Sequence, residues 1–168
     1  MGKLLELDRA RYVNRCVPKF QKYFRLQSES RFRFVRKFYR KLYARECRRL
    51  LIEMPSSKAI GGGLCINHPM CITINKDAIL GRNVNLHKGV TIGQENRGIR
   101  KGSPVIGDCV WIGVNATIVG NVRIGNDVLI APNSYVNCDV PDHSVVFGNP
   151  CIIKHKVNAT ESYINRTI

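Results

Sequence analysis

The most regular feature of this sequence is an apolar residue that recurs at every sixth position through most of residues 60–136. The residue two positions before it is mostly apolar or small, and Gly or Asn follows it in nine of twelve cases. The series consists of Ile60, Ile66, Ile74, Leu80, Leu86, Ile92, Ile106, Ile112, Ile118, Ile124, Ile130 and Val136. Self-similarity at a fixed period indicates a repeat architecture.

This repeat predicts a short strand and a corner in every six residues. Apolar residues at alternate positions share one side of a strand, and Gly or Asn at a fixed place indicates a corner with positive φ. Three strands and three corners make a triangular coil of about eighteen residues, and stacked coils bury a continuous apolar column. A β-sandwich would need longer and less evenly spaced strands. We therefore predict an all-β solenoid, a parallel β-helix, over residues 54–140, with a cap and tail over residues 141–168.

Residues 1–53 lack this period and show helical spacing instead. Between residues 31 and 52, apolar and aromatic side chains recur at helical spacing while cations fill the opposite face. The recurring side chains are Val35, Phe38, Tyr39, Leu42 and Tyr43. A weaker helical pattern spans residues 8–26 and is interrupted by Pro18. We therefore expect a short α-helical N-terminal arm, residues 1–53, ahead of the solenoid.

The formal net charge of +15 is concentrated in this arm. Residues 1–53 hold 16 Lys and Arg against 5 Asp and Glu, a net of +11, which leaves +4 for the rest. Such a surface attracts phosphate backbones or anionic lipids, and the segment RFRFVRKFYRKLYAR mixes aromatic residues with its cations, which suits a membrane interface. The sequence contains no recognised nucleic-acid-binding motif. We expect peripheral contact with a membrane and no nucleic acid. A non-catalytic membrane- or nucleic-acid-binding β-helix protein is the alternative.

The seven cysteines carry information about the compartment. Their number is odd, no C-x-x-C pair occurs, and the sequence shows neither a secretory signal nor an apolar run of membrane-spanning length. This pattern predicts free thiols in a reducing cytoplasm. It also argues against a structural zinc site, and we expect no metal.

Three irregularities interrupt the repeat. Two extra residues enter between Ile66 and Ile74, near the segment NHPM. The polar, glycine-containing residues 94–103 should project from the coils as a loop, which is either functional or a tolerated insertion. The third irregularity is the C-terminal segment PDHSVVFGNP, which ends the regular coils.

Residues 53–156 resemble the hexapeptide-repeat acyltransferases, and most of all the serine acetyltransferase-like branch, which includes O-acetyltransferases of capsule and exopolysaccharide synthesis. The resemblance is carried by AIGGGLCINHP, HKGVTIG, PVIGDCVWIGVNATIVGNVRIGNDVLIAPNSYV and DVPDHSVVFGNP. It implies a left-handed β-helix, a homotrimer with active sites between subunits, and acetyl-CoA as the acetyl donor. The implied reaction is direct acetyl transfer to a hydroxyl group, without an acyl-enzyme.

The resemblance also implies catalytic residues. His68 matches the histidine that takes the proton from the acceptor hydroxyl, and Glu53 stands where the family has an aspartate that orients this histidine. The chemistry fits, because a hydroxyl is a poor nucleophile until a base near neutral pKa removes its proton, and a carboxylate can fix the histidine tautomer. The other interpretation of His68 is an ordinary surface corner residue. Asn67, which replaces an aspartate of the family, and His87, about one coil further on, are the predicted substrate-binding residues.

The predicted acetyl-CoA site is likewise taken from the resemblance. Gly93, Gly113, Val114 and Pro132 match positions that line the cofactor, and Lys154 and Lys156 would meet its phosphates. Serine acetyltransferases carry an Arg-His pair where this chain has Gly102-Ser103. The acceptor is therefore either L-serine or a sugar hydroxyl of a small molecule or glycan.

A γ-carbonic-anhydrase-like metalloenzyme is a weaker alternative with the same fold. Its zinc site needs three converging histidines. The chain offers His68, His87, His143 and His155, of which the last two fall in the terminal cap.

Overall fold

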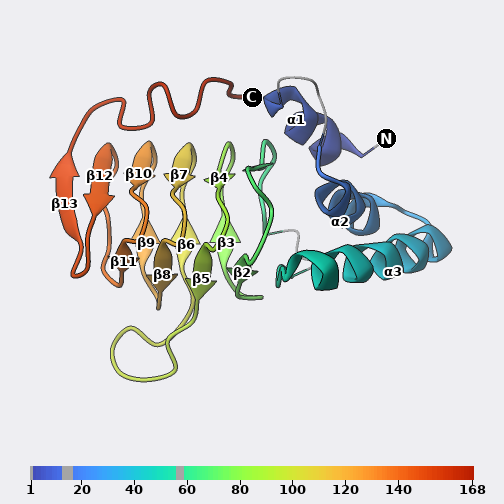
Figure 1. Ribbon diagram of the computed structural model, residues 1–168, viewed down its shortest axis with the longest axis horizontal. Coiled ribbons are helices and arrows are strands. Elements are labelled where there is room, and N and C mark those ends of the chain that lie inside the picture. The colour runs from blue at the N-terminus through green and yellow to red at the C-terminus, as the bar shows by residue number, and fades with distance from the viewer. Residues whose placement is uncertain (1, 13–16, 56–58) are drawn as a thin grey trace.

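A computed structural model describes residues 2–12, 17–55 and 59–168 of the chain, and its main body is a stack of triangular β-coils (Figure 1). The helices are α1 (Lys3–Arg11), α2 (Lys19–Glu29) and α3 (Arg33–Leu50). The strands are β1 (Cys65–Ile66), β2 (Thr73–Ile74), β3 (Ile79–Leu80), β4 (Asn85–Leu86), β5 (Thr91–Gly93), β6 (Val105–Ile106), β7 (Val110–Ile112), β8 (Thr117–Val119), β9 (Arg123–Ile124), β10 (Val128–Ile130), β11 (Tyr135–Val136), β12 (Ser144–Phe147) and β13 (Ile152–His155).

The strands form three sheets, one on each side of the stack. The six-stranded sheet has the order β1-β4-β7-β10-β12-β13, the four-stranded sheet β11-β8-β5-β2, and the three-stranded sheet β3-β6-β9. Every pairing is parallel except that of β12 with β13. From β1 to β11, successive strands of one sheet are separated by one strand from each of the other two, which confirms the predicted parallel β-helix.

The register confirms the coil length and two of the predicted irregularities. Val110 pairs with Val128, eighteen positions later, as one regular coil requires. Cys65 pairs with Asn85, twenty positions later, so the first coil holds two extra residues. Thr91 pairs with Thr117 across twenty-six positions, and the eight extra residues belong to the loop that projects from the coils between β5 and β6 (Figure 1).

The core is the predicted apolar column. The repeat residues point inward and stack coil upon coil, so that Ile92, Ile112, Ile118 and Ile130 have no exposed surface. Branched aliphatic side chains suit such short strands because they pack well against neighbours on a pleated surface.

The corner glycines have a different physical cause from the one predicted. We expected positive φ directly after the repeat residue, but Gly61, Gly81 and Gly107 lie outside that region, and positive φ occurs two residues later, for example at Asn83. A Cβ on Gly61 would lie 2.4 Å from the carbonyl oxygen of Gly81, and one on Gly81 would lie 2.5 Å from that of Gly107. Glycine is therefore required because successive corners stack too closely for a side chain.

The N-terminal arm is helical, as predicted, but its first part differs. The weaker pattern over residues 8–26 corresponds to two helices with other bounds, α1 and α2, and Pro18, the predicted interruption, occupies the N-cap of α2. Proline is tolerated at a helix start because the backbone N–H groups there lack helical partners. α3 matches the predicted helix, although Tyr43 is its only buried residue, in a segment that the structure describes in full.

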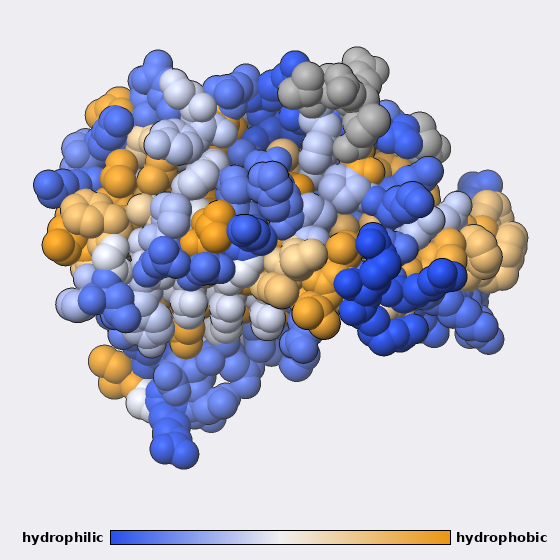
Figure 2. Space-filling model, in the orientation of Figure 1, coloured by the Kyte–Doolittle hydropathy of each residue, from blue (hydrophilic) through white to orange (hydrophobic). Residues whose placement is uncertain are grey.

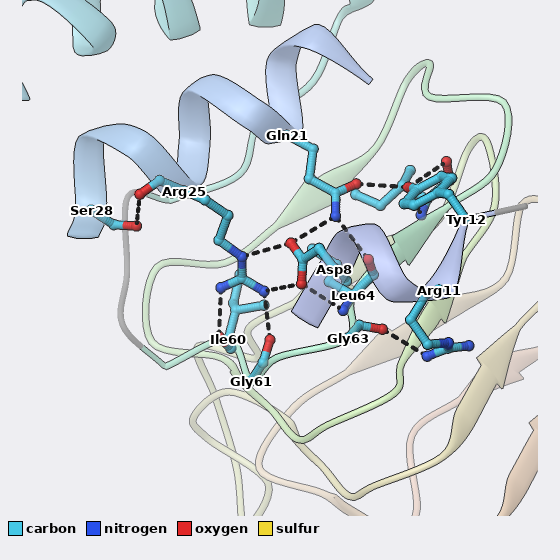
Figure 3. Close-up of polar contacts among 11 residues, drawn as sticks. Asp8, Arg11, Tyr12, Gln21, Arg25, Ser28, Ile60, Gly61, Gly63 and Leu64 are labelled. Carbon is cyan, nitrogen blue, oxygen red and sulfur yellow. Dashed lines mark hydrogen bonds and ion pairs between the residues drawn. The ribbon is translucent and has the colours of Figure 1, made fainter. Parts of the chain in front are cut away.

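The arm closes the open end of the solenoid. Figure 3 shows Asp8 of α1 and Arg25 of α2 reaching the first coil, where Arg25 donates to the carbonyl oxygens of Ile60 and Gly61 and Asp8 accepts from the Leu64 N–H. These backbone groups have no preceding coil to pair with, and a buried polar group without a partner is costly. The arm thus acts as an end cap.

At the other end, residues 156–168 return along the outside of the six-stranded sheet towards α1 (Figure 1). We call this segment the C-terminal strap. Asp127 accepts hydrogen bonds from its Ala159 and Thr160, and Asn83 exchanges two with Ile168. The strap therefore fastens the last coils to the first.

Candidate functional site

Most of the predicted site residues lie along one edge of the prism, where the six-stranded sheet turns into the four-stranded sheet. Asn67 follows β1, His87 follows β4 and Gly113 follows β7, and the backbone register stacks these three positions. We call this line the histidine edge. Its members are Asn67, His68, His87, Gly113, Val114 and Pro132.

His68 occupies the coil that carries two extra residues. The other coils place one residue with positive φ at this edge, at Gly89, Asn115 and Asn133, and Cys71 supplies the equivalent residue of the first coil. His68 adds a second, with φ 53°. Non-glycine residues in this region are uncommon and often mark functional sites. The insertion thus presents an exposed imidazole that a regular coil would not.

His87 is held in one tautomer. Its Nδ1 lies 3.0 Å from the carbonyl oxygen of Ile112. A carbonyl can only accept, so Nδ1 carries the proton and Nε2 keeps its lone pair. The Asn67 amide nitrogen lies 3.5 Å from Nε2, which is long for a hydrogen bond and leaves room for another donor. Burial lowers the pKa of His87, and the nearby His68 lowers it further, against the opposing effect of the Ile112 carbonyl.

Glu53 lies on the adjacent face rather than at the edge itself. It extends the four-stranded sheet, where it forms a bridge with Thr73, and its N–H donates to the carbonyl oxygen of Ile72. Its side chain is exposed, as is that of His68. Among the residues the structure describes, no hydrogen bond or ion pair joins Glu53 to His68.

Gly113 has a structural requirement of its own. A Cβ at this position would lie 2.6 Å from the backbone nitrogen of Pro132, so glycine is needed for stacking whether or not a ligand binds. Gly93 does not lie on the histidine edge. It ends β5 opposite Val119, at the next edge, where the nearest atoms to a Cβ would be 3.7 Å away.

The two predicted phosphate-binding lysines lie at the C-terminal end of the stack. Lys154 pairs with Val145 in the β12–β13 hairpin, and its ammonium lies 5.7 Å from the centre of the Phe147 ring. The Lys156 N–H donates to the His143 carbonyl. β13 runs back across the six-stranded sheet. Lys156 therefore lies at the far edge of this sheet, away from the edge that holds Pro132.

The four histidines form two separate pairs. His143 bonds to Asp127 at 2.8 Å and its ring lies 6.4 Å from that of His155, whereas His68 and His87 share the histidine edge. Among the described residues, no group of three or more His, Cys, Asp or Glu side chains has metal-binding geometry.

Sequence reasoning missed an aromatic contact beside the histidine edge. The ring centres of Trp111 and His87 lie 4.5 Å apart, and that of Tyr163 of the strap lies 5.0 Å from that of Trp111. The alternation of the repeat places Trp111 on the outside of β7, which the sequence could have shown. The sequence carries no signal for the return of the strap.

Residues 103–138 match the family model described as bacterial transferase hexapeptide (six repeats). A serine acetyltransferase of Staphylococcus aureus (strain Mu50) is 38% identical over 99 residues, which cover 59% of this chain and 46% of that protein. Serine acetyltransferase 4 of Arabidopsis thaliana is 36% identical over 99 residues, which cover 59% of this chain and 28% of that protein. The chain thus spans less than half the length of these curated relatives.

Solved structures extend the likeness to the helical arm. The serine acetyltransferase of Neisseria gonorrhoeae in complex with serine matches with a TM-score of 0.73 and 28% identity, over 89% of this chain and 67% of that one. The enzyme of Brucella abortus strain S19 matches with a TM-score of 0.75 and 26% identity, over 94% and 70%. The chain therefore has the left-handed parallel β-helix fold of these solved structures and is similar to the serine acetyltransferases.

Proposed function

We propose that this protein is an acetyl-CoA-dependent O-acetyltransferase in which His68 is the general base. The observation that carries the proposal is the place of His68, exposed on a two-residue insertion at an edge of the β-helix, in a chain that is similar to serine acetyltransferases. A surface corner histidine would need neither the insertion nor the left-handed backbone.

The proposed reaction is a direct transfer. The acceptor hydroxyl oxygen attacks the thioester carbonyl while His68 takes the hydroxyl proton, and the new C–O bond forms as the C–S bond breaks. The sulfur of CoA leaves as the thiolate and receives the proton that His68 holds. No cysteine nucleophile takes part in this transfer.

Neighbouring groups would position the acceptor. Glu53 would orient the His68 ring from the adjacent face of the coil. The neutral His87 presents Nε2 as a fixed acceptor for a substrate hydroxyl, and the Asn67 amide supplies a donor beside it. A neutral acceptor next to the base avoids placing a second positive charge there, which would oppose proton transfer to His68.

The donor would lie along the coils towards the C-terminal end. Gly93, Gly113, Val114 and Pro132 would line acetyl-CoA, and Lys154 and Lys156 would meet its phosphates. Gly93 and Lys156 lie off the histidine edge, so one subunit cannot present all six positions on one line. We propose a homotrimer with the site between neighbouring subunits, where different edges of two prisms face each other.

The acceptor has two candidates. The relatives are named for serine. A free amino acid carries an ammonium and a carboxylate, however, whereas the groups next to the His87 ring nitrogens are the uncharged Asn67 amide and Ile112 carbonyl. At Gly102-Ser103, where serine acetyltransferases carry Arg-His, the Ser103 hydroxyl donates to Asn75 at 2.9 Å. The replacement of the Arg-His pair by uncharged residues supports a sugar hydroxyl as the acceptor.

The test offers L-serine and a panel of sugars in parallel to the purified full-length protein with acetyl-CoA, and follows CoA release and acetylated product by mass spectrometry. Acetylserine would assign the serine branch, and an O-acetyl sugar would assign the sugar branch. Acetyl-CoA binding is measured separately by calorimetry. Neither binding nor turnover would contradict the transferase proposal.

We also propose that α3 brings the protein to an anionic membrane surface. α3 contains eight Lys and Arg and one Glu, and Phe34 and Phe38 are 73% and 58% exposed. Figure 2 shows strongly hydrophilic and hydrophobic side chains side by side over this helix, which extends away from the coils. Arg33, Arg36 and Phe34 also line a hollow beside α2. Cations that bind lipid phosphates beside aromatic rings that enter the interface are typical of peripheral helices. Among the described residues, no helix is long and apolar enough to span a membrane.

Vesicle flotation tests this contact. Binding to vesicles that contain phosphatidylglycerol, but not to neutral phosphatidylcholine vesicles, is expected, with loss in a Phe34→Ser, Phe38→Ser variant. Binding to neither, or equal binding by the variant, would contradict it. A matched control is Ile99→Ser, which removes a 99% exposed apolar side chain from the projecting loop.

A further inference from the structure

Two cysteines lie in contact at the C-terminal end of the solenoid. The sulfur atoms of Cys138 and Cys151 are 3.6 Å apart. Cys138 follows β11, and Cys151 lies in the turn just before β13. Both thiols are partly buried and free. The contact joins the last regular coil to the terminal hairpin.

We propose that Cys138 and Cys151 form a thiol modification site that closes to an intrachain disulfide when it meets a low-molecular-weight disulfide such as oxidised glutathione. The inference does not depend on the acetyltransferase proposal. The chain needs little movement, because a shift of each sulfur by a fraction of a side-chain length brings them to bonding distance.

The chemistry is thiol–disulfide exchange in two steps. One cysteine thiolate attacks a sulfur of oxidised glutathione, forms a mixed disulfide and expels one glutathione thiolate. The second cysteine thiolate attacks the protein sulfur of that mixed disulfide and expels the other. The two protons lost by the cysteines are taken up by the two glutathione thiolates. The protein loses two electrons, and the oxidant gains them.

The other described cysteines lack this arrangement. Cys65 is buried, whereas Cys71 is exposed at the far end of the stack. The Cys109 sulfur lies 3.9 Å from the Asn83 amide. Internal closure requires a second thiol within reach, so an exposed single thiol such as Cys71 stops at the mixed disulfide. Cys16 lies outside the described residues.

Local electrostatics give the site a pH dependence. Burial raises the pKa of Cys138, and the adjacent Cys151 thiol and the Asp139 carboxylate raise it further, while the Arg100 guanidinium on the projecting loop, 4.0 Å from Asp139, opposes them. The thiolate is the reacting form. Closure therefore becomes faster as pH rises, and replacing Arg100 by Gln slows it at a fixed pH.

The link would hold the terminal hairpin on the coil stack. With both thiols free, the Tyr135 N–H donates to the carbonyl oxygen of Gly148 at 3.0 Å, which ties the turn before β13 to β11. A covalent bond beside this contact limits local opening of β13 and of the strap that follows it. Slower proteolysis within residues 152–168 is the expected structural consequence.

The experiment treats the reduced full-length protein with oxidised glutathione, blocks remaining thiols with iodoacetamide, and maps the cysteines by mass spectrometry under denaturing, non-reducing conditions. The expected digest contains one peptide linked through Cys138 and Cys151, whose mass is two hydrogen atoms below the sum of its two thiol peptides. Cys138→Ser and Cys151→Ser should each leave a stable glutathione adduct on the remaining partner. Cys71→Ser, the matched control, should keep the link. Adducts on both partners without a link, a link to another cysteine, or a link between two chains would overturn the proposal.

Discussion

Arg25 donates to both carboxylate oxygens of Asp8, at 2.8 and 3.1 Å, and the two side chains are 1% and 0% exposed. The pair lies between the helical arm and the first coil, and both partners also bond to the coil backbone. Gln21 completes the cluster by donating to Asp8 and to the Leu64 carbonyl (Figure 3). Part of the arm's polar character therefore serves to cap the β-helix, and the charge left for a partner lies mainly on α3.

The first prediction concerns this pair. Replacing Arg25 by Met leaves the Asp8 carboxylate and the Ile60 carbonyl buried without their partner. Breaking a buried ion pair from one side costs about 3–5 kcal/mol. The free energy of unfolding, measured by urea titration, should fall by that amount. Arg49→Met is the control, because Arg49 is 63% exposed in its pair with Glu46, and such a surface pair should be worth less than about 1 kcal/mol. Equal losses in the two variants would contradict the end-cap account.

The stacked corners make a second prediction. A Cβ on Gly107 would lie 2.7 Å from the Gly125 carbonyl oxygen, whereas one on Gly93 meets nothing closer than 3.7 Å. Gly107→Ala should therefore lower the free energy of unfolding by about 1–3 kcal/mol, as overpacking does. Gly93→Ala should change it by less than about 0.5 kcal/mol. Thermal unfolding of both variants decides the matter, and a well-tolerated Gly107→Ala would show that the corners are not tightly stacked.

These glycines also show where sequence reasoning stops. The inward residues were predictable because each one, such as Ile112, occupies a fixed place in a short period that maps directly onto the coil. The reason for the glycines was not, because close stacking is a property of neighbouring coils rather than of one corner. Asp8 and Arg25 were missed for a related reason. Polar residues in a helix normally face water, and only the unpaired backbone of the first coil makes their burial favourable.

The candidate site was predictable in the same uneven way. The two-residue shift in the repeat predicted the irregularity at His68, and the register confirmed it. The contact of His87 with Asn67 follows from stacking positions one coil apart. The packing of Tyr163 on Trp111 could not be predicted, because it depends on the path of a tail without periodicity.

A third prediction uses the lowered pKa of His87. Its folded-state pKa lies below the ordinary histidine value of about 6.5, so the unfolded chain binds the proton more readily. The contribution of neutral His87 to the free energy of unfolding is fully present above that ordinary value and is lost as pH falls towards the folded-state pKa. Wild-type protein should therefore lose more stability than His87→Gln between pH 7.5 and 5.5. The effect should stay well below the limit of about 1.4 kcal/mol per pH unit, because the ring is only half-buried. Identical pH profiles in urea titrations would contradict this.

A fourth prediction concerns the strap. Burial alone would raise the pKa of Asp127, but hydrogen bonds from His143, Thr160 and Ala159 lower it overall. The stabilisation of the strap by the ionised Asp127 carboxylate is therefore complete above the ordinary Asp pKa. It is lost as pH falls through the lowered pKa of Asp127. Asp127→Asn should speed hydrogen exchange at the Ala159 and Thr160 amides at neutral pH. Glu161→Gln, an exposed change in the same segment, should not, and equal exchange in both variants would show that Asp127 does not fasten the strap.

The most direct test of the central claim is the initial rate of CoA release from acetyl-CoA, with the acceptor found in the panel, for the wild type, His68→Ala and His155→Ala. We predict that His68→Ala lowers the rate by about 10²–10⁴ while still binding acetyl-CoA, because only the base is lost. His155→Ala, which removes an exposed histidine from the other pair, should match the wild type. Undiminished acceptor-dependent release by His68→Ala would contradict the assignment of the histidine edge as the catalytic site.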